Sequence, residues 1–400
     1  MKSIEIIFWI CMAIVIYTYV GYGVVLYLMV KVKEWIKPEQ KPQLPPDNEW
    51  PEVTLLVAAY NEEEVVTEKI ANTLALDYPE EKLKLMWVTD GSNDHTNDLL
   101  AAYQRVEVLY TPERRGKTAA LNRSIDYVKT PIVIFTDANT MINREAVKEI
   151  IRQFTNPKVG CVAGEKRIAA KEKDGAAGGG EGLYWKYESA LKRLDGQLYS
   201  AMGAAGELFA VRRELFEKME SDTLLDDFIL SMRIVEKGYK IAYCAEAYAI
   251  EDGSANMQEE QKRKVRIAAG GLQSIWRLRP LMNIFKHGIV SFQYVSHRVM
   301  RWSITPIALF ALLPLNAVLA FTTTGYAAIL YLSILMMQIL FYLMGYWGHV
   351  LSTMQIKNKL LYVPYYFLFM NVNVIRGFFY LQKKKGSGVW EKAQRSKRGA

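Results

Sequence analysis

The stretch IVIFTDANT, Ile132 to Thr140, runs from four apolar residues into a carboxylate at Asp137 and a carboxamide at Asn139. Its first half has the length and composition of a buried strand. A strand followed by an Asx turn needs no chemistry to explain it, because Thr, Asp and Asn are ordinary turn residues. Whether the carboxylate belongs to a site therefore depends on what else ends at the same edge of the sheet.

Segments typical of strands and of helices alternate between about Pro51 and Asp252. This alternation predicts an α/β fold with a mixed, mostly parallel sheet and helices on both faces. Ligands of such sheets bind beyond the carboxyl ends of the strands. Three predicted strands end in polar clusters, which are Tyr60-Asn61-Glu62, Asp90-Gly91-Ser92 and Asp137-Ala138-Asn139. Three clusters at one edge indicate a site there.

Other nucleotide-binding and metal-binding patterns are missing from the sequence. No G-x-G-x-x-G motif follows the first strand and there is no Walker loop, which excludes the dinucleotide and P-loop classes. The glycine-rich segment Gly175–Gly182 follows no predicted strand, so we expect a flexible loop there. Cys11, Cys161 and Cys244 are scattered and predict neither a disulfide framework nor a metal site.

Two apolar regions are long enough to cross a membrane. Ile6–Val30 carries no charge, and Trp302–Ile356 is a second uncharged run that a TTTG sequence divides into two helices of crossing length. A third segment, Leu360–Ile375, is shorter and contains two asparagines. We expect this segment to lie in the membrane interface or to re-enter, because crossing would place the strongly basic C-terminal tail outside.

The lysines after the first apolar segment predict a cytoplasmic catalytic part in an integral protein of the inner membrane. Basic residues that flank membrane segments and face anionic membrane lipid account for the net charge of +8. No basic patch interleaved with aromatic residues forms a nucleic-acid-binding module, so no nucleic acid is expected as a partner.

Five motifs occur in the order and spacing of one enzyme group. VAAYNEEE, VTDGSNDHT, GKTAALN, FTDANT and LLDDFILSMRIVEKGYK resemble the membrane-bound family 2 glycosyltransferases, which include hyaluronan, cellulose and poly-N-acetylglucosamine synthases. The resemblance covers about Val53 to Arg266. It implies a GT-A fold and transfer of a sugar, with inversion, from a nucleotide-diphosphate donor.

The resemblance assigns several residues to the donor. Asp90 matches the position that hydrogen-bonds the uracil base, and Lys117 matches the basic residue near the diphosphate. Tyr60 and Glu62 resemble donor-contacting positions. Lys117 also begins a helix whose N-terminus favours phosphate.

Asp137 and Asn139 occupy the D-x-D position, which implies Mg²⁺ or Mn²⁺ as cofactor. Asn139 stands where the family has a second Asp, so its oxygen can ligate the metal but brings no negative charge. We therefore expect a metal that is required but weakly held.

Asp226 and Asp227 match the carboxylates of the family's T-E-D motif, in which the last residue is the general base. The neighbouring carboxylate would raise the pKa of Asp227 and favour proton abstraction. Asp226 and Asp227 also complement a helix dipole, which is the purely structural alternative. Small residues in Gly203–Phe216, with Glu165 and Arg167, are expected to face the same cleft.

Residues 261–265, QKRKV, stand where processive synthases carry Q-x-x-R-W. Gln261 is kept and Lys264 stands at the Arg position, while Arg263 and Arg266 are close by and could serve the diphosphate. Val265 replaces the tryptophan on which an acceptor sugar stacks, and Trp276 or Trp302 could compensate. The predicted order is an N-terminal transmembrane helix, a GT-A domain, amphipathic interface helices, a C-terminal membrane region and a basic tail, at residues 1–34, 50–255, 256–300, 301–382 and 383–400.

These features together predict an inverting glycosyltransferase that uses a UDP-sugar and extends an extracellular or capsular polysaccharide. The loss of the tryptophan keeps a second hypothesis open, transfer of a single sugar to a polyprenyl-linked or glycolipid acceptor. A membrane protein that binds sugar nucleotides without catalysis is the alternative outside the enzymes, although it would not need Asp227.

Overall fold

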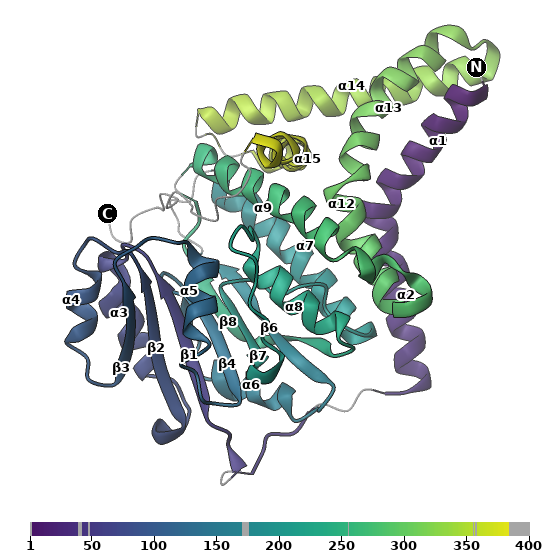
Figure 1. The fold of residues 1–400 in the computed structure, drawn as a ribbon. Helices are drawn as coiled ribbons and strands as arrows, with labels where there is room; N and C mark the ends of the chain where they lie inside the picture. Colours follow the sequence, from purple (N-terminus) through teal and green to yellow (C-terminus); the bar gives the residue numbers. More distant parts are fainter. Residues whose placement is uncertain are drawn as a thin grey trace.

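The computed structural model describes residues 2–38, 42–46, 49–169, 176–254, 256–354, 356 and 358–383. Most of the predicted basic tail lies outside these residues. One sheet with helices on both faces forms the globular part, and α1, α13 and α14 project away from it (Figure 1).

The sheet has eight strands in the order β3-β2-β1-β4-β7-β6-β8-β5. The β3-β2-β1-β4 half is parallel, β7 runs antiparallel between β4 and β6, and β6 and β8 pair in parallel. The expected mixed, mostly parallel sheet is therefore confirmed. In chain order the strands are Val53–Ala59, Leu83–Asp90, Val106–Thr111, Ile132–Asp137, Met141–Ile142, Val159–Ile168, Leu208–Arg212 and Lys240–Glu251.

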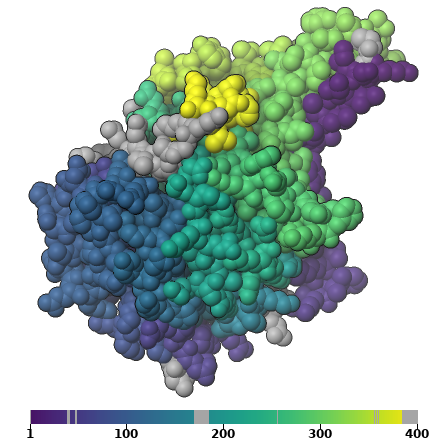
Figure 2. All heavy atoms as spheres, viewed as in Figure 1, coloured from purple at the N-terminus to yellow at the C-terminus, as the bar shows by residue number. Residues whose placement is uncertain are grey.

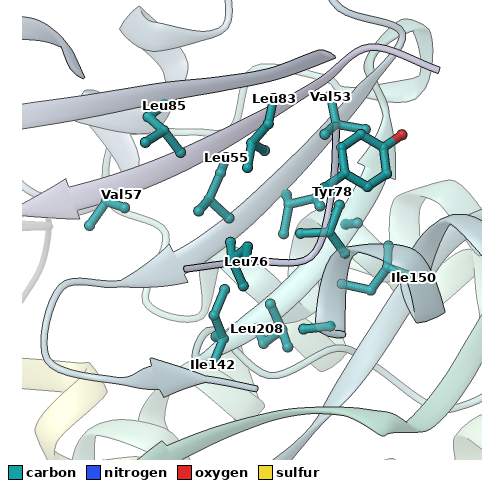
Figure 3. Close-up of a cluster of buried hydrophobic side chains, with 14 of the residues drawn as sticks. Val53, Leu55, Val57, Leu76, Tyr78, Leu83, Leu85, Ile142, Ile150 and Leu208 are labelled. Carbon is teal, nitrogen blue, oxygen red and sulfur yellow. The ribbon is translucent and has the colours of Figure 1, made fainter. Parts of the chain in front are cut away.

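Side chains that alternate along the strands build an apolar layer on each face of the sheet. In β1, Leu55 and Val57 lie in one layer (Figure 3), whereas Leu56 lies in the other. Helices α3 and α6 complete the first layer, and α5 and α8 the second. The bounds of α3, α4, α5, α6 and α8 are Glu63–Leu74, Thr96–Ala101, Lys117–Ser124, Ala146–Phe154 and Asp226–Glu236.

The three polar clusters meet at one edge, as expected. The register pairs Ala58 of β1 with Asp137 of β4, and Ala59 with Thr89 of β2. Asp90 and Asp137 therefore end strands on either side of β1.

Three described helical segments are long and apolar enough to cross a membrane: Lys2–Ile36, Ile304–Thr322 and Gly325–Thr353. The first consists of α1, Lys2–Ile16, and α2, Tyr22–Ile36, joined by a π-helical turn. The other two are α13 and α14, which confirms the predicted pair of helices with a short turn. A hydrogen bond between the Thr18 and Thr305 hydroxyls, 2.9 Å long, links the first segment to α13.

Helix α7, Ala176–Leu198, begins within the glycine-rich segment, so the expectation of a flexible loop at Gly175–Gly182 is wrong. Tertiary packing overrides the low helix propensity of glycine. Leu191 is buried against Tyr22 and Leu26 of α2, which fixes the helix against the first membrane segment.

Helices α9 and α15 pack against each other above the carboxyl edge of the sheet. Gly377 of α15 allows the close approach, because a Cβ atom there would lie 2.6 Å from the Cβ of Ala268. Figure 2 shows α15, in yellow, at the surface between the sheet domain and α14. The position of α15 in a membrane stays a prediction. The bounds of α9, α10, α11, α12 and α15 are Met257–Arg277, Ile284–His287, Ile289–Tyr294, Met300–Trp302 and Lys359–Lys383.

Candidate active site

A cavity of about 470 Å³ lies between the carboxyl edge of the sheet and helices α9 and α15. Its volume is in the range of ordinary small-molecule sites. Seven charged residues singled out from the sequence line it, which are Lys117, Asp137, Asp226, Asp227 and, from α9, Arg263, Lys264 and Arg266. The small residues Ala204, Ala205 and Gly206 also line it, as expected for that segment.

Asp90 organises the loop that leads into α5. Its Oδ2 atom accepts hydrogen bonds from the backbone N–H groups of Arg115, at 3.0 Å, and Gly116, at 2.6 Å. Its Oδ1 atom is buried and has no hydrogen-bond partner in the described part of the chain. A buried acceptor without a donor is costly, so this oxygen suits a ligand N–H group.

Tyr60 and Glu62 belong to the same edge but do not line the cavity. The guanidinium of Arg114 stacks over the Tyr60 ring, 3.7 Å from its centroid. The backbone N–H of Glu62 donates to the Thr96 hydroxyl at 2.8 Å, just before α3 begins. The structure thus places both residues beside the Asp90 loop, and their donor contact stays a prediction.

Lys117 and Asp137 form an ion pair at the wall of the cavity. The Nζ atom of Lys117 lies 2.7 Å from Oδ1 of Asp137 and 3.8 Å from Oδ2 of Asp226. Burial opposes the charge of this ammonium, but the carboxylates of Asp137 and Asp226 outweigh that effect and raise the pKa of Lys117. The lysine therefore stays charged beside the end of β4.

The chemistry of Asp137 and Asn139 fits a hard divalent cation, because both offer oxygen ligands. Asn139 makes a long contact, 3.5 Å from its Nδ2 to Oε1 of Glu251, and does not line the cavity. No group of three or more His, Cys, Asp or Glu residues suited to a metal occurs among the described residues. Mg²⁺ sites of one or two carboxylates completed by water and substrate phosphates are common, and these residues fit that type.

Asp226 and Asp227 open α8 and line the cavity. Burial, and then the charge of Asp226, raise the pKa of Asp227 to about 7. Gly206 leaves the space in front of it open, since a Cβ there would lie 3.3 Å from both Oδ2 of Asp227 and Nζ of Lys117. A carboxylate with a pKa near neutrality beside open space is suited to accept a proton.

The basic residues of α9 are held by carboxylates. Lys264 is buried with its Nζ 3.3 Å from Oε1 of Glu260, and the guanidinium of Arg263 lies 3.5 Å from Oε2 of Glu251. Gln261 does not line the cavity, and neither does Val265. Burial and the neighbouring Arg263 lower the pKa of Arg266, which also lines the cavity, as its expected place near the diphosphate requires.

Strand β6 contributes Lys166 rather than its neighbours. Alternation along the strand sends Lys166 into the cavity, where it bonds to Glu207 and Glu251. Glu165 and Arg167 do not line the cavity, contrary to the expectation that they face the cleft. The period of two within GEKRI was the signal that would have identified Lys166.

Further functional candidates come from segments without a motif. Glu188 and Lys192 of α7 line the cavity together with Arg298 and Arg301, which precede α13. Trp302 also lines it, with its ring 5.1 Å from that of Phe228, whereas Trp276 is mostly exposed. These residues meet only through tertiary packing. The four-residue spacing of Glu188 and Lys192 on one helix face was the only signal.

Known proteins resemble this chain in sequence and in fold. The family model described as "Glycosyltransferase like family 2" matches residues 51–270. Poly-beta-1,6-N-acetyl-D-glucosamine synthase of Staphylococcus aureus (strain COL) is 29% identical over 238 residues, and the Staphylococcus epidermidis protein of that name is 27% identical over 234 residues. Each match spans 56% of this chain and 56% of the relative, so the chain spans about half the length of these relatives.

A solved structure shares nearly the whole fold. The mannosyltransferase of Pyrobaculum calidifontis, determined in complex with GDP-Man and Mn²⁺, superposes with a TM-score of 0.67 over 96% of this chain and 100% of that chain, at 21% identity. Because the family model covers more than half of the sequence, the chain belongs to glycosyltransferase family 2, with a GT-A fold.

Proposed function

We propose that the protein transfers a sugar, with inversion, from a UDP-sugar to a hydroxyl group of a growing polysaccharide at the membrane. The observation that carries the proposal is the position of Asp227, a half-buried carboxylate with a pKa of about 7, in one cavity with Lys117 and Asp137. The names of the staphylococcal relatives, which are polysaccharide synthases, support the polymeric product.

The donor would lie along the carboxyl edge of the sheet. The free Oδ1 atom of Asp90 would accept from the base, and Lys117 would bind the diphosphate. Asp137 and Asn139 would hold Mg²⁺ or Mn²⁺. Bound there, the divalent cation would neutralise the charge that builds up on the leaving diphosphate.

Asp227 would take up the proton that the acceptor hydroxyl loses. The acceptor hydroxyl would transfer its proton to Asp227 as its oxygen forms a bond to C1 of the donor sugar. The bond from C1 to the diphosphate would break on the opposite side, which inverts the configuration, and UDP would leave. Lys117 would stabilise the negative charge on the departing oxygen.

Transfer of a single sugar to a lipid-linked acceptor is the second candidate. Two observations favour it: Val265 supplies no stacking ring, and Tyr366 with other residues of α15 gives the cavity an apolar wall. We place the catalytic domain on the cytoplasmic face of the inner membrane in either case, since the UDP-sugar would come from the cytoplasm.

A donor panel with product sizing tests the proposal. The full chain in detergent would receive UDP-sugars with Mn²⁺ or Mg²⁺, and both UDP release and product length would be measured. We expect release with one donor and a product of many sugars. A product extended by one sugar would establish the second candidate. Sugar-nucleotide binding without release would establish the non-catalytic alternative. Release with GDP-sugars alone would overturn the assignment of a uridine nucleotide as the donor.

A further inference from the structure

Lys192 is a buried cation without a counter-ion. It lies on α7 and is only 6% exposed, yet it lines the cavity. Its ammonium makes no hydrogen bond and no ion pair with any residue that the structure describes. The ring of Trp185 is its cation–π partner, at 6.0 Å from Nζ to the ring centroid. An ammonium removed from water without an anion is costly, so this position calls for a negatively charged ligand.

The nearest carboxylate on the same helix face is already engaged. Oε1 of Glu188 lies 2.7 Å from the guanidinium of Arg298, and Oε2 lies 3.0 Å from that of Arg301. Oε2 of Glu188 is also 3.4 Å from Nε2 of His297. Two guanidinium groups therefore share the carboxylate of Glu188, and Lys192 adds a further positive charge to this part of the cavity. Burial, and then the charge of Arg298, lower the pKa of Lys192, as expected where positive charge is in excess.

A second buried carboxylate nearby does not change this balance. Asp195 accepts hydrogen bonds from the hydroxyl of Tyr22 and from Nε2 of Gln293, and it bonds to Nδ1 of His297. Its side chain is fully buried and is absent from the cavity lining. The excess positive charge at Lys192 thus remains open to an anion that enters through the cavity.

The surroundings of Lys192 favour an acceptor over the donor as the source of the anion. Among the carboxylates that act on its ammonium is Asp227, the candidate base, together with Glu188 and Glu207. The donor diphosphate already has Lys117, which is ion-paired with Asp137 at the end of β4. An anion at Lys192 would therefore belong to the molecule whose hydroxyl group meets Asp227.

The same cavity has an apolar wall formed by the helices that lead toward the membrane. Phe367, Met370 and Val374 of α15 line it, as does Tyr19 of the first membrane segment. Farther along α15, Val363 lines the cavity while remaining 54% exposed, so the apolar wall continues to the outer surface. A ligand that contacts both Lys192 and the apolar wall would carry a negatively charged group and an apolar chain.

We propose that Lys192, flanked by Arg298 and Arg301, binds the phosphate of a lipid-linked acceptor whose apolar chain lies along α15. This inference rests on the proposed function, in the form of its second candidate, and identifies the charged group of that lipid-linked acceptor. The phosphate is an anchor and does not react, and the hydroxyl that attacks the donor lies at Asp227. The structure thus assigns an acceptor that is an amphiphilic phosphate ester.

Binding of a lipid phosphate without donor tests this subsite independently of catalysis. The probes are radiolabelled polyprenyl phosphate and the uncharged polyprenol, each offered to the full chain in detergent. We expect polyprenyl phosphate to bind at least about tenfold more tightly, the effect of one or more charge-assisted hydrogen bonds. Inorganic phosphate should compete only weakly, because it lacks the chain. Equal binding of the two lipids would overturn the proposal, and so would inorganic phosphate that binds as tightly as the lipid.

Variants at Lys192 link the effect to this residue. In Lys192→Met the preference for polyprenyl phosphate should fall by about tenfold or more, whereas Lys192→Arg should keep most of it. Lys186→Met is the matched control, because Lys186 is exposed on the same helix and does not line the cavity. Without lipid, Lys192→Met should melt no lower than the wild type, since it removes an uncompensated buried charge. Unchanged lipid preference in Lys192→Met would overturn the proposal.

Kinetics then separate this subsite from the donor site. Lys192→Met should raise KM for a phosphate-bearing lipid acceptor and leave KM for the UDP-sugar unchanged. A rise in the donor KM alone would place Lys192 at the diphosphate and contradict the inference. An enzyme that binds polyprenyl phosphate but releases no UDP would refute the proposed function while supporting the subsite.

Discussion

The pKa of Asp227 predicts the pH dependence of the reaction. Burial and Asp226 raise this pKa to about 7, and a general base must be ionised to accept a proton. About half of the enzyme would carry the ionised base at pH 7, and roughly a tenth would carry it at pH 6. The rate of UDP release should therefore rise nearly tenfold per pH unit up to about pH 7 and level off above it.

Asp226→Asn should shift that profile in a defined direction. The substitution removes the neighbouring negative charge, which is the second cause of the raised pKa, and leaves burial, the first cause, in place. The pKa of Asp227 should fall by about one unit, a shift typical of one neighbouring like charge. Ionised enzyme would then persist to lower pH, so the rising limb should move from about pH 7 toward about pH 6.

The assay is UDP release between pH 5 and pH 9 at saturating donor, with wild type and Asp226→Asn measured in parallel. The position of the limb is the diagnostic quantity, because the substitution is also expected to change the maximal rate. Asp222→Asn is a suitable control, since Asp222 pairs with Arg277 and does not line the cavity. A wild-type rate that is constant from pH 5.5 to pH 8, or a limb that moves to higher pH in Asp226→Asn, would refute the assignment of Asp227.

Three further outcomes follow from the same site and its support. Lys117→Met removes the cation 2.7 Å from Asp137 and should raise KM for the UDP-sugar by roughly tenfold or more. Steady-state kinetics measure this value, and an unchanged KM would contradict the contact between Lys117 and the diphosphate. Asn139→Asp adds a second negative charge and should lower the Mn²⁺ concentration for half-maximal activity by roughly tenfold. The wild type should lose activity in EDTA, and activity that persists in EDTA would contradict the requirement for a metal. Gly377→Val forces a side chain toward Ala268 and should destabilise the protein by about 1–3 kcal/mol, seen as a lower Tm in detergent. Gly253→Ala is the control, because the nearest atom to its new Cβ would lie 3.7 Å away, and it should have little effect on Tm.

The position of the site at the carboxyl edge of the sheet could be predicted, because sequence patterns within short segments determine it. The three strands that end in polar clusters run parallel in one sheet, so Asp90 and Asp137 had to lie at the same edge. The series of motifs also located Lys117 and Asp227, which the structure brings into one cavity. These residues were accessible from the sequence because each lies at the start of a helix or at the end of a strand.

The acceptor side was not predictable, because its parts meet only through long-range packing. Helix α7 begins in a glycine-rich segment that has no helical signal, and its packing against α2 stabilises it. Lys192 and Arg298 are 106 residues apart and belong to no motif. Sequence periodicity places each on a helix but does not predict which helices converge.

UDP release by Asp227→Asn, compared with the wild type at pH 8 with Mn²⁺ and the preferred donor, tests most directly whether the chain is a glycosyltransferase that uses Asp227 as its base. The asparagine side chain has nearly the same shape as aspartate but cannot accept the proton, so UDP release should fall by about 10²–10⁴-fold. The affinity for UDP, measured by calorimetry, should stay within about threefold of the wild-type value. Release at the wild-type rate, or a loss of UDP binding that accounts for the whole defect, would contradict the role of Asp227 as the base.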